Sequence, residues 1–525
     1  MDVADRDAAL EALDFGKVDA ESELDLEQRF VRTADFDELA TQDIWIALGP
    51  KGTGKSALFE VFAKHEALAR RLAPGDLERV ILTTGTGFGD LSELATGDIE
   101  RLSAETGYDH DKLWRLYVAV RAGMGIAAAG VSVPNGPLRD LLRALGEEPD
   151  RRVLPVMKSL WKTVVGDAPS EISIASRGAT VTIRGGKRAL DVISLLQYEQ
   201  EALEAAGKTL WIFFDKVDEI FPANPTERRS AIEGLMTAAM AIRRQFPAIQ
   251  PKILLRTDIW QDLRFTNKSH LSDKRVLLSW SEEQLAVLLL KRACVDPLVQ
   301  ALVEAQVPSL VGAEVEALTR VEVETGLKVI FPEKVYPGER EADIVDWIVA
   351  RVTDAQGTVL PRETIMLGNR AQVEQMSLGG RAADSSLLSR EAVREAFTYV
   401  SNERVSSYLA EFPDVEEHLK RFRGQQTSNF TRDALEALMD GLEPSGIDLL
   451  DRLFEIGVLE PMKGTTVTAE SFEIPRLTAS AWVWSSGAAR SVSPRWRVKR
   501  LGRRSPTRAF ARGHSLTLAH ASCTR

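Results

Sequence analysis

Short apolar runs alternate with helical periodicity over the first half of the chain. Four such runs stand at 44–48, 79–84, 209–214 and 252–256. Residues 56–72 follow the first run with apolar side chains at helical spacing, and residues 228–245 separate the last two runs in the same way. Continuous apolar runs are typical of buried parallel strands, and their alternation with helices indicates a parallel sheet. The pattern therefore predicts an α/β fold.

The second half of the chain changes to a mainly helical pattern. Residues 281–427 repeat apolar positions at helical spacing in several stretches, which predicts a helical lid. Residues 431–441 and 446–457 then indicate two helices, and short extended runs follow at 458–459 and 471–474. Two helices followed by a hairpin are typical of a winged helix.

These patterns divide the chain into five predicted parts. The stretch between the second and third apolar runs is a large insertion whose role the pattern does not indicate. The parts are an acidic N-terminal helical segment over 1–43, the sheet domain over 44–280 with the insertion at 85–208, the helical lid over 281–427, the winged-helix-like domain over 428–476 and a basic tail over 477–525.

Charge is distributed unevenly along the chain. The net charge is −11, but residues 477–525 contain ten Lys or Arg and no acid, so the remainder carries −11 − 10 = −21. An acidic body disfavours non-specific binding to nucleic acid phosphates. The tail lacks sustained periodicity, and we expect it either to be disordered or to be translated from a shifted reading frame.

Composition also narrows the expected compartment. No apolar run approaches the roughly 20 residues that span a bilayer. The first residues include acids where a signal peptide has a basic region, and the two cysteines, Cys294 and Cys523, are too few for a disulfide framework. We therefore expect a cytoplasmic protein without a membrane partner.

A phosphate-binding motif follows the first apolar run. Residues 49–56 read Gly-Pro-Lys-Gly-Thr-Gly-Lys-Ser and fit G-x-x-x-x-G-K-[ST] at every fixed position. Glycines let backbone N–H groups surround an anion, and the helix that follows directs its positive end at the phosphates. This predicts binding of ATP with Mg²⁺. The expected nucleotide-binding residues are Gly49, Pro50, Lys51, Gly52, Thr53, Gly54, Lys55, Ser56 and Ala57, with Lys55 on the β- and γ-phosphates and Ser56 on the metal.

The third apolar run ends in carboxylates. Asp215 directly follows Trp211–Phe214 and is the expected second metal residue, in contact with Mg²⁺ directly or through water. Asp218 and Glu219 come just past the strand end, where either could orient and deprotonate an attacking water. We take Glu219 as the candidate base and Asp218 as the alternative.

Two later segments supply candidate phosphate sensors. The fourth apolar run ends in Arg256-Thr257-Asp258, and a polar residue at this position can contact the γ-phosphate. We select Thr257, with Asp258 and Arg256 as alternatives. Arg362 opens a predicted helix after the sheet and is a candidate second sensor.

Several segments together resemble a known group. They are 15–23 (Phe-Gly-Lys-Val-Asp-Ala-Glu-Ser-Glu), the loop 49–56, 212–219 (Ile-Phe-Phe-Asp-Lys-Val-Asp-Glu), 255–259 (Leu-Arg-Thr-Asp-Ile), 361–363 (Pro-Arg-Glu) and 472–477 (Phe-Glu-Ile-Pro-Arg-Leu). The chain resembles signal-transducing P-loop NTPases of the STAND and KAP type, and bacterial P-loop ATPases linked to phage defence. The resemblance implies an AAA-like core, a helical lid, a winged helix and an ATP-dependent change of assembly or partner.

The sequence favours an ATP-driven regulatory switch and leaves two alternatives open. The switch would act on an unidentified protein partner or assemble with itself. An initiator-like ATPase could instead bind DNA through the winged helix, but the expected recognition helix carries Asp448, Asp451 and Glu455 against one Arg452. A third class binds nucleotide without turnover, because Lys216 stands where many AAA enzymes have their catalytic glutamate.

Overall fold

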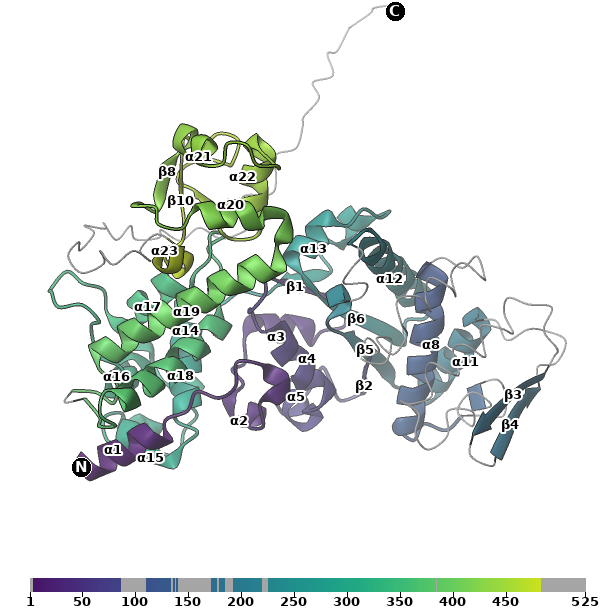
Figure 1. Ribbon diagram of the computed structural model, residues 1–525. Coiled ribbons are helices and arrows are strands. Elements are labelled where there is room, and N and C mark those ends of the chain that lie inside the picture. Colours follow the sequence, from purple (N-terminus) through teal and green to yellow (C-terminus); the bar gives the residue numbers. More distant parts are fainter. Residues whose placement is uncertain are drawn as a thin grey trace, which may run out of the picture. The chain divides into compact units, whose positions relative to one another are not determined.

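The computed structural model describes residues 3–85, 110–133, 136, 138–139, 171–176, 179–184, 192–219, 225–383 and 385–482 (Figure 1). Its central feature is a sheet of five parallel strands in the order β2-β5-β6-β1-β7. The strands are β1 (Ile46–Gly49), β2 (Val80–Thr84), β5 (Thr209–Phe214), β6 (Ile249–Arg256) and β7 (Arg275–Leu277). The predicted α/β class with a parallel sheet is confirmed.

Helices cover both faces of this sheet, because alternate side chains of each strand point to opposite faces. On β5, Trp211 and Phe213 lie in one apolar cluster, whereas Leu210, Ile212 and Phe214 lie in another. The first cluster includes α3 (Ala34–Leu39), α4 (Lys55–Ala63) and α5 (Glu66–Leu72). The second includes α8 (His110–Ala128), α11 (Val192–Ala205) and α12 (Pro225–Gln245). The sheet is therefore the middle of three layers.

Several shorter elements accompany the sheet. The region predicted as an insertion contains α8, α11 and a hairpin of β3 (Glu171–Ser176) with β4 (Ala179–Arg184), and its residues 86–109 and 140–170 lie outside the described residues. Short helices before residue 280 are η1 (Ala20–Ser22), α2 (Leu26–Arg29), η3 (Val217–Glu219), α13 (Thr257–Asp262) and η4 (Lys268–Leu271). Three further 3-10 turns, η5 (Pro308–Leu310), η6 (Val315–Ala317) and η7 (Pro413–Val415), lie in the later parts of the chain.

A second apolar core is built from the helices that follow the sheet. They are α14 (Glu282–Ala293), α15 (Pro297–Glu304), α16 (Arg320–Ile330), α17 (Ile344–Val352), α18 (Pro361–Ser377) and α19 (Arg390–Glu411). Their buried leucine, isoleucine and valine side chains form one cluster. These helices correspond to the predicted lid. Among the described helices, none combines the length and the apolar character needed to cross a bilayer.

The N-terminal segment contacts both cores. Helix α1 (Val3–Ala12) and Phe15 pack into the lid cluster, whereas α3 packs against the sheet. Between them, buried Glu23 accepts a hydrogen bond at 3.1 Å from Arg292 of α14. The side chain of Lys252 on β6 is fully buried, and its Nζ donates to the backbone carbonyls of Leu39, Thr41 and Ile44. The segment therefore joins the lid to the sheet.

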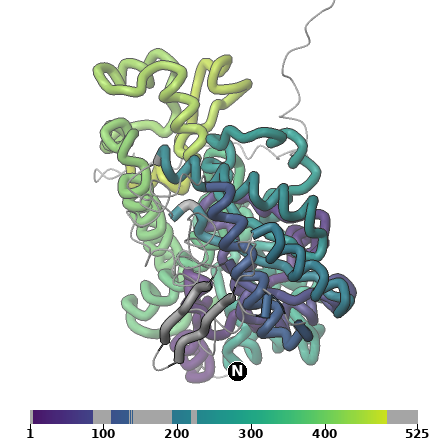
Figure 2. Tube along the Cα trace, turned by 90° about the vertical axis from the view of Figure 1, so that its right-hand side faces the viewer, coloured from purple at the N-terminus to yellow at the C-terminus, as the bar shows by residue number. Residues whose placement is uncertain are grey.

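The C-terminal part has the arrangement of a winged helix. Helices α20 (Glu416–Arg421), α21 (Arg432–Leu438) and α22 (Gly446–Glu455) pack with an antiparallel sheet in the order β8-β10-β9. The strands are β8 (Asn429–Thr431), β9 (Glu460–Pro461) and β10 (Ser471–Glu473). Figure 2 shows α19, in green, continuing into this yellow-green part.

The described residues end in a short helix, α23 (Arg476–Trp482). The chain is therefore folded beyond residue 477, where the tail was expected to begin. It packs on α19, with Leu477 in the lid cluster and Trp482 in the winged-helix cluster. The Trp482 ring is fully buried, 5.7 Å from the Phe422 ring. Residues 477–482 thus differ from the expected disorder, and the rest of the predicted tail lies outside the described residues.

Trp482→Ala is expected to lower the free energy of unfolding by about 3–5 kcal/mol, because it leaves a large cavity in the winged-helix cluster. Val467→Ala is the control, since Val467 is 66% exposed in the same part of the chain and its truncation should change stability by less than about 0.5 kcal/mol. Urea unfolding followed by circular dichroism measures both. Equal midpoints for the two variants would show that α23 does not contribute to this core.

Candidate nucleotide site

The predicted phosphate loop joins β1 to α4 at the carboxyl edge of the sheet. Gly52 and Gly54 have φ values of +91° and +97°, which residues with a Cβ rarely adopt. A Cβ at position 49 would lie 2.4 Å from Oγ1 of Thr53, which itself donates to the Pro50 carbonyl at 2.9 Å. The glycines of the motif are therefore required by the path of the loop.

Lys55 is the first residue of α4 and its side chain folds back over the loop. Its Nζ donates to the carbonyls of Gly49 and Pro50, both at 2.8 Å. The backbone N–H groups of the first helical turn lie at the same end of α4, where the positive end of the helix favours an anion. Ser56 and Ala57 follow in that turn and are half-buried. The predicted nucleotide-binding residues thus form one continuous loop and helix start.

The predicted metal carboxylate lies at the same edge of the sheet. Asp215 directly follows β5 and is 8% exposed. Glu219 is exposed at the end of η3, and the side chain of Asp218 lies outside the described residues. Parallel strands direct their carboxyl ends to one edge, which brings Asp215 to the edge that carries the loop.

Lys216 is held by the N-terminal segment. It has a positive φ of 55°, and its Nζ forms an ion pair with Glu21. Burial lowers the pKa of Lys216, but the hydrogen bond and negative charge of Glu21 outweigh that effect, so the pKa is raised overall. The ammonium group therefore stays protonated next to Asp215 and Glu219.

The tip of β6 carries a network of charges. The guanidinium of Arg256 bonds both carboxylate oxygens of Asp258, at 3.0 and 2.7 Å. Burial raises the pKa of Asp258, but Arg256 and the positive charge of Lys55 more than offset this, and the pKa is lowered. Thr257, the predicted sensor, begins α13 between these two residues. The phosphate-loop lysine and the β6 tip thus share one electrostatic environment.

The predicted second sensor lies directly against the loop. Arg362 is in the first turn of α18, and its backbone N–H donates to the Gly52 carbonyl at 3.3 Å. A Cβ at position 52 would lie 3.2 Å from the Arg362 Cβ. The next residue, Glu363, is buried and accepts a hydrogen bond from Arg404 at 2.8 Å. The start of α18 is therefore one wall of the site.

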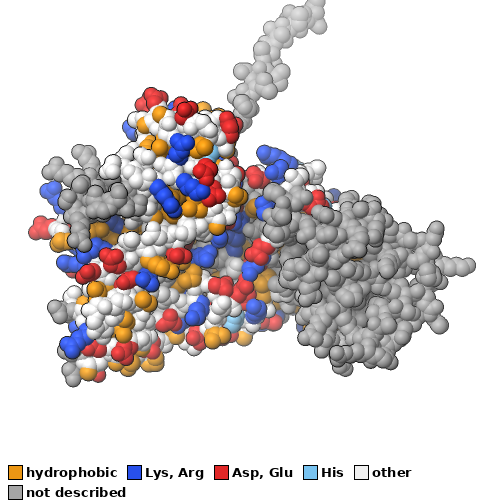
Figure 3. All heavy atoms as spheres, in the orientation of Figure 1, with side chains coloured by type: hydrophobic (Ala, Val, Ile, Leu, Met, Phe, Trp, Pro, Cys, Tyr) orange, Lys and Arg blue, Asp and Glu red, His pale blue; other side chains and the backbone are white. Residues whose placement is uncertain are grey.

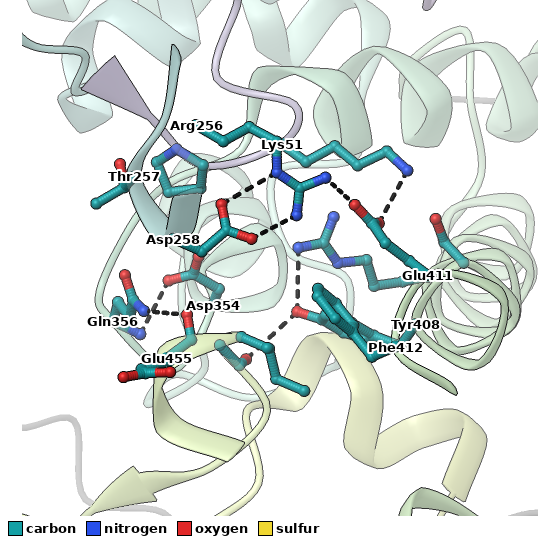
Figure 4. Close-up of a pocket in the computed structure, with 15 residues that line it drawn as sticks. Lys51, Arg256, Thr257, Asp258, Asp354, Gln356, Tyr408, Glu411, Phe412 and Glu455 are labelled. Atoms are coloured by element: carbon teal, nitrogen blue, oxygen red, sulfur yellow. Dashed lines mark hydrogen bonds and ion pairs between the residues drawn. The ribbon is translucent and has the colours of Figure 1, made fainter. Parts of the chain in front are cut away.

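A cleft opens beside the loop, and sequence reasoning missed much of its lining (Figure 4). Lys51, Arg256 and Asp258 line one side, and the lid and winged helix supply the other. The missed residues are Asp354, Gln356, Arg404, Ser407, Tyr408, Glu411, Phe412, Glu455, Ile456 and Gly457. The sequence carried one signal of this cleft. Arg404, Tyr408 and Glu411 recur at helical spacing along α19, so they form a polar stripe where a helix that only packs on a core would carry apolar side chains.

The comparisons with known proteins give a partial match. No family model matches the chain. The chain is similar to "Putative transposon gamma-delta 80.3 kDa protein" of Escherichia coli (strain K12), with 25% identity over 296 residues. That similarity covers 53% of this chain and 39% of the relative, so the chain spans well under half of the relative's length.

Two solved structures are similar over most of the chain. Cdc6p from Pyrobaculum aerophilum has 13% identity and a TM-score of 0.30, with 83% of this chain and 86% of that chain covered. The Aeropyrum pernix ORC2 protein, in ADPNP–ADP complexes, has 12% identity and a TM-score of 0.35, with 88% and 91% covered.

The cleft predicts a pH effect on stability. Burial raises the pKa of Asp354 to about 6, although backbone hydrogen bonds and Arg404 act in the opposite direction. The folded state thus holds this proton more tightly than the unfolded state, and the resulting stabilisation is lost as pH rises through about 6. Between pH 4 and 8, wild type should lose up to about 3 kcal/mol relative to Asp354→Asn. Urea unfolding at intervals of pH measures the difference, and a constant difference would contradict the expected titration.

Proposed function

We propose that this chain is a Mg²⁺-dependent ATPase whose nucleotide state controls contacts with a protein partner or a second copy of itself. The observation that carries the proposal is the loop between β1 and α4. Its two left-handed glycines, its lysine at the helix start and the positive end of the helix that follows together suit a polyphosphate. Lys55 would bridge the β- and γ-phosphates, with Arg362 and Thr257 as further phosphate contacts.

Magnesium is compatible with the residues at this edge. Ser56 offers a hydroxyl and Asp215 a carboxylate, and oxygen ligands of these kinds are the ones that Mg²⁺ prefers. When bound, the ion neutralises charge that develops on the phosphate oxygens. Asp215 is buried, so its negative charge is poorly screened by solvent and would interact strongly with a cation.

Hydrolysis requires a base that can activate water. Glu219 is our proposed base because its side chain is exposed just past the strand end, beyond the buried Asp215. Asp218 remains the alternative. The Lys216–Glu21 ion pair gives Lys216 a structural partner, which is consistent with a base at another position. A measured rate of ATP hydrolysis distinguishes this proposal from the alternative of a scaffold that only binds nucleotide.

Partner control is supported by what surrounds the loop. The lid contributes Arg362 and Glu411 to the site, and the winged helix contributes Glu455 to the same cleft. A change of charge at the phosphates would therefore act on both parts. A role in phage defence stays a prediction that rests on the sequence resemblance alone.

Reading of DNA by α22 is the less favoured alternative. This helix carries Asp448, Asp451 and Glu455, and its single Arg452 is paired with Asp414 at 2.8 Å. The carbonyls of Phe454 and Glu455 at its end accept hydrogen bonds from Gln356. Figure 3 shows acidic and basic side chains mixed over the described face, without a continuous basic surface there. Phosphate binding by this helix is electrostatically disfavoured.

Lys55→Ala is expected to weaken ATP binding about 10- to 100-fold, because the charged hydrogen bonds to the phosphates are lost. Isothermal titration calorimetry with Mg²⁺ present measures the affinity. Lys64→Ala is the matched control, since it removes a mostly exposed lysine at the other end of α4. Unchanged affinity in Lys55→Ala would refute the assignment of the loop.

Glu219→Gln should slow ATP hydrolysis about 10²- to 10⁴-fold and leave ATP affinity unchanged, because a general base contributes to the chemical step alone. Steady-state phosphate release measures turnover, with Asp218→Asn assayed in parallel. Normal turnover in Glu219→Gln combined with loss in Asp218→Asn would exchange the two roles. Stimulation of the wild-type rate by duplex DNA in the same assay would favour the DNA-binding alternative.

A further inference from the structure

One carboxylate of the lid holds two cations of the nucleotide site. Glu411 is the last residue of α19, and its Oε2 pairs with Nζ of Lys51 in the phosphate loop at 2.9 Å. Its Oε1 pairs with Nη1 of Arg256 at the β6 tip. Figure 4 shows the carboxylate between these two side chains. The loop and β6 are thus connected through a residue that belongs to neither.

The Glu411–Arg256 pair is better shielded from solvent than an ordinary surface pair, whereas the side chain of Lys51 is 37% exposed. The side chains of Glu411 and Arg256 are 18% and 17% exposed, so solvent screens them only in part. Burial raises the pKa of Glu411, but Arg256 and Lys51 outweigh that effect and keep the pKa lowered. Glu411 is therefore ionised at neutral pH and presents two negative oxygens to the two cations.

The same cations are suited to phosphate oxygens. Arginine forms paired hydrogen bonds with carboxylate and phosphate alike. Arg256 already bonds Asp258, whose carboxylate lies within the electrostatic reach of Lys55. A series of neighbouring charged side chains therefore connects the expected position of the β- and γ-phosphates, through Asp258 and Arg256, to Glu411.

On this basis we infer that the Glu411 carboxylate competes with the terminal phosphate of the nucleotide for Lys51 and Arg256. The inference rests on the proposed ATP binding and adds a means of regulation to it. A triphosphate brings an additional charged group to these cations and displaces the carboxylate. A diphosphate lacks that group and leaves the contact in place.

Displacement of Glu411 would reach the winged helix directly. Phe412 follows Glu411 and η7 leads from there into α20. One turn earlier on α19, the Tyr408 hydroxyl lies 3.4 Å from the carbonyl of Gly457, just after α22. The backbone N–H of Ala355 donates to that same carbonyl at 3.2 Å. We therefore expect ATP, but not ADP, to loosen the contact between α19 and the end of α22.

Glu411→Gln tests this competition, because it keeps the shape of the side chain and removes its charge. Glu403→Gln is the control, since Glu403 lies exposed on the same helix, outside the cleft. Calorimetry with Mg²⁺-ATP and with Mg²⁺-ADP should show Glu411→Gln binding ATP about 5- to 150-fold more tightly than wild type does. Its ADP affinity should change much less, and Glu403→Gln should match wild type with both nucleotides.

Hydrogen exchange provides a second measurement on the full chain. Without nucleotide, the Ala355 amide should exchange faster in Glu411→Gln than in wild type, and ATP should produce the same change in wild type. Equal gains for ATP and ADP, or no gain over Glu403→Gln, would overturn the inference while ATP binding stands. Failure of every variant and of wild type to bind ATP would instead refute the proposed function, and the inference with it. Glu411→Ala replaces Glu411→Gln if the latter does not fold.

Discussion

Parallel strands end at a single edge of their sheet, and the arrangement of the candidate site depends on this constraint. Because β1, β5 and β6 run in the same direction, the phosphate loop, Asp215 and Arg256 all follow strand ends at that edge. The segments are far apart in sequence, and the sheet register alone brings them together. The lid and the winged helix then contribute residues to a site whose position is already fixed.

The parts predicted from sequence were those that short, local patterns determine. The loop 49–56 combines a fixed spacing with a preceding apolar strand and a following helix, so its fold could be read directly. The winged-helix pattern was similarly local, and α22 begins at the predicted residue, Gly446. Roles of the individual site residues in binding and turnover remain predictions.

Other features depend on contacts that a local pattern cannot contain. Strand β7 has three residues and a charged first position, so it carries too little apolar signal. Strand β6 begins at Ile249, before the predicted run. The prediction missed this start because Gln250 and Pro251 interrupt the apolar pattern. Helix α23 is short and rich in Ser, Thr and Ala, and packing of Leu477 and Trp482 stabilises it. Glu411 meets Lys51 across 360 positions of sequence.

The buried Lys252 makes the N-terminal segment inseparable from the sheet. Three carbonyl groups accept from its Nζ, and only the protonated amine has three N–H donors to offer them. Burial lowers the pKa of Lys252 well below its usual value, because the charged form loses its hydration in the core, and these three hydrogen bonds offset part of that loss. A chain shortened to begin at β1 would lack all three of these carbonyl acceptors. The acidic N-terminal segment therefore supplies the hydrogen-bond acceptors of an amine that lies inside the sheet domain.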